Sequence, residues 1–139
     1  MFILDEYLNK DCIAIGNFPL CQLLLKNDKK YPWFILVPRR NDTIEVFDLL
    51  PDEQHQMWAE VTTFSEILKA DFKADKINIG TLGNIISQLH IHVIARRKDD
   101  ATWPASVWDK LPAEPYEQNE IEAIKAHLQK IMPVTFSFK

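Results

Sequence analysis

Hydrophobic and polar residues alternate most clearly over residues 88–94, which read Gln-Leu-His-Ile-His-Val-Ile. Successive side chains of a β-strand point to opposite faces, so this pattern predicts a strand, which we extend from Gln88 to Ala95. One face of that strand consists of the apolar residues Leu89, Ile91 and Val93, which suit a core. The other face carries three polar side chains in a row, those of Gln88, His90 and His92.

Other stretches show the spacing of strands or of amphipathic helices. Short apolar runs predict four more strands, and the first two form a hairpin; they cover residues 12–16, 20–25, 33–38 and 76–79. Apolar residues at helical spacing predict a long helix from Pro51 to about Ala70 and another from Glu117 to about Met132. Residues 4–8 could form a short helix, and residues 134–138 a short strand or a docking tail. Hairpin-connected strands with segregated helices indicate an α+β fold on an antiparallel sheet.

Composition narrows the class of protein without identifying it. The 139 residues suit one domain, and the apolar content of 47% is ordinary for a globular protein. The net charge of −4 gives no electrostatic footprint for nucleic acid or an anionic membrane, so neither is expected as a partner. Cys12 and Cys21 lie in apolar runs and are expected to be small buried residues rather than a disulfide. No signal peptide or membrane-spanning run is recognised, so a cytoplasmic location is expected.

Two histidines on one face of a strand have three interpretations. They could be solvated residues on the polar side of an antiparallel strand. They could ligate a metal, since neutral imidazole binds zinc, but Cys12, Cys21 and His55 lack ligand-like spacing to the pair. They could also act in catalysis, one as a nucleophile and the other as its partner.

Residues 88–94 resemble the signature of the histidine triad (HIT) superfamily, with Gln88 in place of the first histidine. Three further elements occur in the family's order. Residues 78–84 are similar to the turn that precedes the catalytic strand, residues 33–40 to the strand ending in Val-x-Pro, and Trp103-Pro104 to a C-terminal Trp-Pro. The resemblance covers roughly residues 10–105. It implies a single HIT-like domain over residues 1–139, with a core at about 10–105 and a C-terminal extension at about 106–139.

The resemblance implies a fold and an activity. The fold would be a five-stranded antiparallel sheet with one long helix, followed here by a C-terminal helix, and the protein would commonly form a homodimer. His90, at the middle position of the signature, would attack the α-phosphorus of a nucleotide ester, anhydride or amidate. His92 would contact phosphate oxygens and assist the leaving group, and as an imidazolium it would stabilise developing charge. No cofactor is implied for this attack.

Three positions depart from the family pattern. Gln88 cannot titrate, although its amide could still orient a neighbour or bind a phosphate oxygen. Asn84 replaces a glutamine and has a shorter reach. Arg39 lies in the segment that replaces Lys-x-His, where arginine remains a good phosphate partner; solvated charge after a strand is the plain alternative.

The remaining candidate nucleotide contacts rest on analogy alone. Asn78 would lie near the phosphate or the ribose, unless it only caps a strand end. Asn27 or Asp28 would hold the ribose hydroxyls. Trp103 would close the site, or else serve as a packing anchor.

Three functions therefore compete. The leading one is an enzyme, a nucleotide hydrolase or transferase acting at the α-phosphate through a nucleotidyl-His90 intermediate, with hydrolase preferred. Its substrates would be phosphoramidates, dinucleoside polyphosphates or nucleotidyl esters. The second is a nucleotide-binding module with weak or no catalysis, and the third is a zinc-binding protein that uses His90 and His92.

Overall fold

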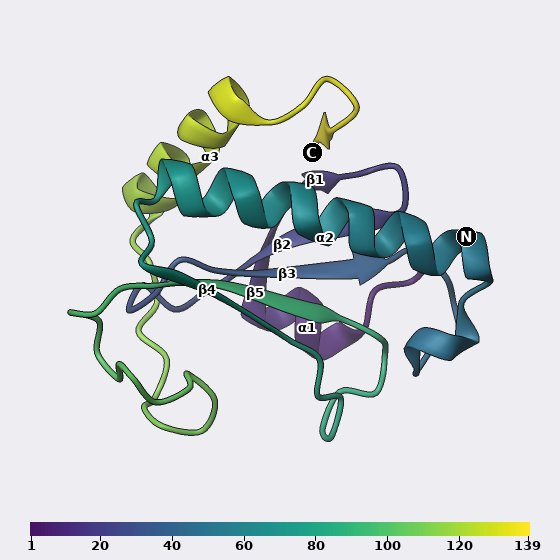
Figure 1. The fold of residues 1–139 in the computed structure, drawn as a ribbon, viewed down its shortest axis with the longest axis horizontal. Helices are drawn as coiled ribbons and strands as arrows, with labels where there is room; N and C mark the ends of the chain where they lie inside the picture. The colour runs from purple at the N-terminus through teal and green to yellow at the C-terminus, as the bar shows by residue number, and fades with distance from the viewer.

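A six-stranded antiparallel sheet forms the centre of the protein in the computed structural model, which describes residues 1–139 (Figure 1). The strand order is β4-β5-β3-β2-β1-β6. The strands are β1 (Cys12–Asn17), β2 (Cys21–Lys26), β3 (Trp33–Pro38), β4 (Lys76–Gly80), β5 (Ile91–Arg96) and β6 (Ser137–Phe138). The expected number of five strands is therefore wrong by one: the C-terminal residues form β6, whose Phe138 pairs with Gly16 of β1.

Three α-helices and a short 3-10 helix, η1, accompany the sheet; they are α1 (Glu6–Asp11), η1 (Val46–Asp48), α2 (Pro51–Asp71) and α3 (Gln118–Ile131). The long and the C-terminal helices match the sequence prediction within two residues at each end. The first helix lies later than expected, because the Asp5 carboxylate accepts the backbone N–H of Tyr7 and caps the helix at that point. Pro51 opens α2, where its missing N–H costs no helical hydrogen bond.

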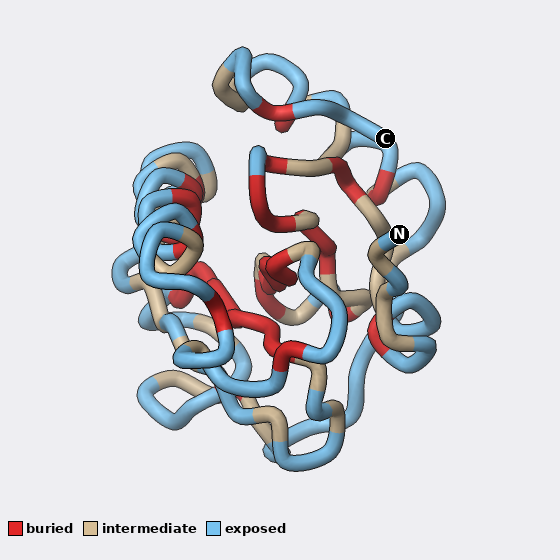
Figure 2. The backbone as a smooth tube through the Cα atoms, turned by 90° about the vertical axis from the view of Figure 1, so that its right-hand side faces the viewer, coloured by how far each residue is buried: buried red, intermediate tan, exposed pale blue.

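The first face of the sheet is covered by α2 and α3, and Figure 1 shows α2 running along the sheet with α3 beside one end. Between them lies a core of 19 buried residues, to which α2 contributes Met57, Val61, Phe64 and Leu68. The C-terminal extension also enters this core through Leu128 and Phe136. Figure 2 shows the buried segments gathered in the interior with exposed segments around them.

A buried carboxylate ties α2 to the first hairpin. Glu60 accepts the backbone N–H of Leu20 at 2.9 Å and that of Cys21 at 2.7 Å. Because a buried charged group is costly unless it is hydrogen-bonded, these two bonds fix where α2 sits relative to the start of β2.

The second face of the sheet is covered as well, by the N-terminal residues with α1 and by the loop that follows β5. A smaller cluster of eight buried residues lies there; it consists of Leu8, Leu24, Tyr31, Trp33, Ile35, Val37, Ile94 and Val107. The cover reaches the face on which the two histidines were predicted. The interpretation that the two histidines are solvated on an open strand face is therefore wrong.

Strand β5 begins later than predicted. Gln88, Leu89 and His90 precede it, because their backbone groups bond outside the sheet ladder. The N–H of Leu89 donates to the carbonyl of Thr43 at 2.9 Å, and the Thr81 hydroxyl donates to the carbonyl of His90 at 2.8 Å. The predicted two faces are nevertheless correct: Leu89, Ile91 and Val93 all belong to the 19-residue core. None of the helices has the length and apolar character needed to cross a membrane.

Candidate active site

The imidazoles of His90 and His92 lie against each other where β5 begins. Their ring centroids are 4.9 Å apart with an interplanar angle of 67°. The residues are only 5% and 7% exposed, respectively. Two buried imidazoles need polar partners, and these partners determine which ring nitrogen of each histidine carries the proton.

A backbone carbonyl fixes the tautomer of His90. Its Nδ1 lies 2.7 Å from the carbonyl oxygen of Gln88. A carbonyl oxygen can only accept, so Nδ1 carries the hydrogen and donates it. In the neutral ring Nε2 then holds a lone pair, which makes it the nucleophilic atom.

Burial keeps the His90 ring neutral. Desolvation lowers the pKa of His90 below its ordinary value, and the positive charge of Lys26 lowers it further. The hydrogen bond to Gln88 and the negative charge of Asp5 raise the pKa but do not outweigh burial. At pH 7 the imidazole is therefore in the unprotonated form that can attack an electrophile.

His92 has the opposite tautomer. The indole Nε1–H of Trp33 donates to its Nδ1 at 2.9 Å, so the hydrogen of the neutral ring lies on Nε2. Burial, followed by the neighbouring His90 and Lys26, lowers the pKa of His92 to about 3. The predicted imidazolium at this position is wrong for the folded protein near neutral pH. His92 instead offers a neutral N–H donor.

Trp108 packs against His92, and the sequence reasoning did not identify it as a site residue. Its ring centroid is 5.4 Å from that of His92 and 6.3 Å from that of Trp33. Gly80, which pairs with His92 across β4 and β5, makes room for it: a Cβ there would lie 2.9 Å from Cη2 of Trp108. The sequence offered one signal for this packing, because Gly80 lies in the predicted turn before the histidine strand and a glycine there allows a large ring to approach the backbone.

Two pockets open beside the histidines. The larger, of about 260 Å³, is lined by His92 together with Lys26, Asp28, Trp33, Trp108 and Asp109 among others. The smaller, of about 80 Å³, is lined by His90 together with Thr81, Gly83 and Ser87 among others. The predicted residue Asp28 and the predicted residue His92 thus share one pocket.

Gln88 acts in two directions. Its backbone carbonyl orients His90, whereas its side chain points to the N-terminal segment. The side-chain oxygen accepts the N–H of Asp5 at 2.8 Å, and the side-chain nitrogen donates to the carbonyl of Ile3 at 2.9 Å. The predicted orienting role therefore belongs to the backbone of Gln88, and the amide side chain binds the chain's own N-terminal segment.

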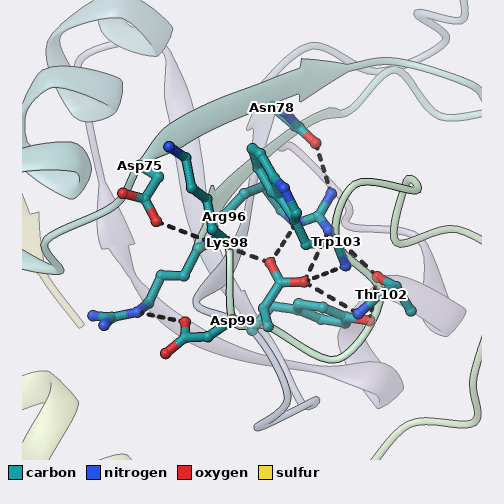
Figure 3. A network of polar contacts seen from close by, with 10 residues as sticks. Asp75, Asn78, Arg96, Lys98, Asp99, Thr102 and Trp103 are labelled. Carbon is teal, nitrogen blue, oxygen red and sulfur yellow. Dashed lines mark hydrogen bonds and ion pairs between the residues drawn. The ribbon is translucent and has the colours of Figure 1, made fainter.

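Asn78 and Trp103 do not join the histidines. Both belong to a network around Arg96, a buried residue on β5 (Figure 3). Arg96 donates to the side-chain oxygen of Asn78 at 2.9 Å and to both carboxylate oxygens of Asp100, and its guanidinium carbon lies 5.6 Å from the Trp103 ring centroid. In the structure Asn78 and Trp103 contact Arg96, and this network holds the loop after β5; their nucleotide contacts stay predictions.

Arg39 and Asn84 are also placed elsewhere. Arg39 donates to the carbonyls of Phe18, Pro19 and Leu20, so it stabilises the first hairpin turn instead of reaching the histidines. Asn84 is exposed in the loop before β5, and it lines neither of the two pockets.

Asn27 and Asp28 are tied to the segment that precedes α3. The side-chain oxygen of Asn27 accepts the N–H of Tyr116 at 2.9 Å. Asp28 forms an ion pair with Lys30 at 2.8 Å and also accepts the N–H of Glu114. No three His, Cys, Asp or Glu side chains of the chain gather closely enough to hold a metal ion.

Comparisons with known proteins identify the family of the chain and its structural relatives. The model of the HIT domain matches residues 8–99. The chain is similar to a histidine triad protein from Sinorhizobium meliloti 1021, with 46% identity, 95% of this chain and 98% of that chain covered, and a TM-score of 0.92. It is similar also to histidine triad proteins from Bradyrhizobium japonicum and Marinobacter aquaeolei VT8. Each is 39% identical with a TM-score of 0.92 over 95% of this chain, and 98% and 96% of those chains are covered.

No curated protein matches the chain significantly. The family match and these structural relatives together show that the chain belongs to the HIT domain family.

Proposed function

We propose that this protein is a nucleotide hydrolase or transferase that acts at an α-phosphate through a nucleotidyl intermediate on His90. Membership of the HIT family supports a nucleotide-binding or hydrolase-type function in general. The observation that carries the specific proposal is the state of His90. Its Nδ1–H is held by the Gln88 carbonyl, and burial lowers the pKa of the ring, so Nε2 has an available lone pair.

The reaction runs in two displacements. In the first, Nε2 of His90 forms a bond to the α-phosphorus while the bond from that phosphorus to the leaving group breaks, and the leaving group takes the electron pair. In the second, a water oxygen bonds to phosphorus, the P–Nε2 bond breaks, and the proton of that water is released to solvent. Splitting one displacement into two lowers the barrier of each.

The neighbours of His90 support the intermediate. Nucleotidylation makes the imidazole cationic, and this cation keeps its Nδ1–H bond to the Gln88 carbonyl and its attraction to the charge of Asp5. His92 contributes its neutral Nε2–H as a hydrogen-bond donor to a phosphoryl oxygen or to the leaving-group atom. Such a preorganised donor stabilises charge that develops during the displacement.

The substrate class that we propose is the one that resemblance to the HIT family implies. We propose phosphoramidates, dinucleoside polyphosphates or nucleotidyl esters, with the phosphate entering the larger pocket beside His92. Asp28, which lines that pocket, or the side-chain amide N–H of Asn27 would hold the ribose. We also propose a cytoplasmic homodimer, and light scattering of the purified protein would measure the oligomeric state.

Acid-quenched intact-protein mass spectrometry tests the function. The protein is mixed briefly with an adenosine phosphoramidate or a fluorogenic nucleotidyl ester, beside His90→Ala and the control His55→Ala, which changes an exposed histidine. A nucleotidyl mass and turnover are expected in the unmodified protein and in His55→Ala, and neither in His90→Ala. If calorimetry shows that nucleotide binds but neither adduct nor turnover is found, the protein is a nucleotide-binding module instead of an enzyme for these substrates.

A further inference from the structure

A bound phosphate carries negative charge, and the signature residues supply no cation to meet it. His92 is neutral, because Trp33 donates to its Nδ1 and burial keeps the ring unprotonated. Gln88 directs its side-chain amide to Ile3 and Asp5. Arg39, the cation expected from the sequence, is bound to the carbonyls of the first hairpin turn.

Lys26 is a cation that the structure places in the pocket beside His92. It is the last residue of β2, and it lines the same pocket as His92 and Trp108. Its Nζ lies 5.5 Å from the centroid of the Trp33 ring, whose N–H holds His92. Its charge is felt at both imidazoles, since Lys26 lowers the pKa of His90 and of His92.

Apart from its contact with the face of the Trp33 ring, the ammonium group of Lys26 has no partner in the protein. It makes no ion pair and no hydrogen bond, whereas the nearby Lys30 is held by Asp28 and by the carbonyl of Pro112. Of the two carboxylates that line the pocket, Asp28 is already paired with Lys30, and Asp109 is exposed and forms no ion pair. Three N–H donors of Lys26 therefore remain available to an anion.

We propose that Lys26 is a substrate-contacting residue whose ammonium binds a non-bridging oxygen of the α-phosphate beside His90 and His92. This inference rests on the proposed function, because it places the same phosphate at the same histidines. Lys26 supplies the positive charge that the neutral His92 and the outward-turned Gln88 do not. Its contact distinguishes nucleotides from nucleosides and leaves the base and ribose to other residues.

Calorimetry with AMP and with adenosine tests this assignment. The variants are Lys26→Met, Lys26→Arg and the control Lys29→Met, which removes the same charge from an exposed residue of the adjoining loop. A charge-assisted hydrogen bond corresponds to roughly a tenfold or greater change in affinity. Lys26→Met is therefore expected to weaken the affinity for AMP at least tenfold and the affinity for adenosine less than twofold. Lys26→Arg and Lys29→Met are expected to retain most of the AMP affinity.

Three results would overturn the assignment. One is equal AMP affinity in Lys26→Met and the unmodified protein. Another is an equal loss of affinity for AMP and for adenosine in Lys26→Met, which would show that Lys26 only shapes the pocket. The third is no AMP binding by the unmodified protein, which would overturn the nucleotide function too. If AMP binds but no adduct or turnover is found, the catalytic proposal fails while the binding comparison still decides the role of Lys26.

Discussion

The two faces of the sheet are built on different principles. The first face, beneath α2 and α3, buries 19 hydrophobic residues. The second face has an apolar cluster of only eight residues, and the same face buries His90, His92 and Arg96. Strand β5 contributes to both, with Ile91 and Val93 on the first face and His92 and Ile94 on the second.

The difference shows where specific geometry is required. Apolar burial is non-directional, so the first face needs only good packing. Each buried polar side chain of the second face needs a partner in a definite direction. His90 is held by a carbonyl, His92 by an indole N–H, and Arg96 by Asp100 and Asn78. The same bonds that make burial tolerable also set the tautomers on which the proposed chemistry depends.

The largest effect is expected on the apolar face. Phe64→Ala removes a fully buried ring that packs edge-on against Phe34, with centroids 4.9 Å apart, and leaves a cavity. Such truncations cost about 4 kcal/mol of unfolding free energy. Urea unfolding would measure the loss beside Thr62→Ala, an exposed residue of the same helix. A loss below about 1 kcal/mol would show that the first face is not packed as a core.

A somewhat smaller loss is expected when a buried charge of the second face loses its partner. Asp100→Ala leaves the Arg96 guanidinium, whose side chain is 1% exposed, without its carboxylate. Removing one partner of a buried pair costs about 3 kcal/mol. Asp99→Ala is the matched control, since Asp99 pairs with Arg97 at the surface, where such a pair contributes little. Equal unfolding free energies for the two variants would contradict the proposed contrast between buried and surface pairs.

The histidine face is also expected to respond to pH, unlike the apolar face. His92 has a pKa of about 3 when folded and an ordinary value of 6.5 when unfolded. Below pH 6.5 His92 binds a proton in the unfolded chain but not in the folded protein. The contribution of His92 to the unfolding free energy is therefore fully present above pH 6.5 and falls progressively towards pH 3. Between pH 6.5 and pH 5 the loss is about 2 kcal/mol, and the lowered pKa of His90 adds to it in the same direction.

Urea unfolding at pH 7 and pH 5 measures this loss in the unmodified protein, in His92→Asn and in the control His55→Ala. Asparagine can still accept the indole N–H of Trp33 but does not titrate. His92→Asn is expected to show a smaller pH dependence, and His55→Ala an unchanged one, because His55 is exposed. The same pH dependence in all three proteins would mean that His92 is not the group that titrates.

The same contrast explains what could be predicted from the sequence. The helical spacing of Met57, Val61 and Phe64 predicted α2, and the alternation over residues 88–94 predicted which side chains share the histidine face, because both patterns follow from local periodicity. The contacts of Asn78, Arg39 and Trp103 could not be predicted in this way. They depend on long-range approaches, such as Asn78 to Arg96, and analogy to relatives assigned these side chains to a ligand. The sequence reasoning did not single out Lys26 or Trp108, because neither residue lies in one of the family motifs.

The smallest effect, and the sharpest test of how the second face works, concerns Gln88. Its side chain bonds to Ile3 and Asp5, and Asn41 bonds to the same N-terminal segment through the N–H of Ile3 at 3.0 Å and the carbonyl of Met1 at 2.7 Å. Gln88→Ala and Asn41→Ala are each expected to cost about 1 kcal/mol in urea unfolding. Their turnover is expected to be similar, because both variants loosen the same segment while the Gln88 carbonyl continues to orient His90.

If turnover instead falls in Gln88→Ala, stays unchanged in Asn41→Ala, and rises in Gln88→His, the side chain at position 88 takes part in the chemistry after all. In that event the N-terminal segment must leave the Gln88 amide when substrate binds, and hydrogen exchange at the N–H of Asp5 would accelerate in the presence of AMP.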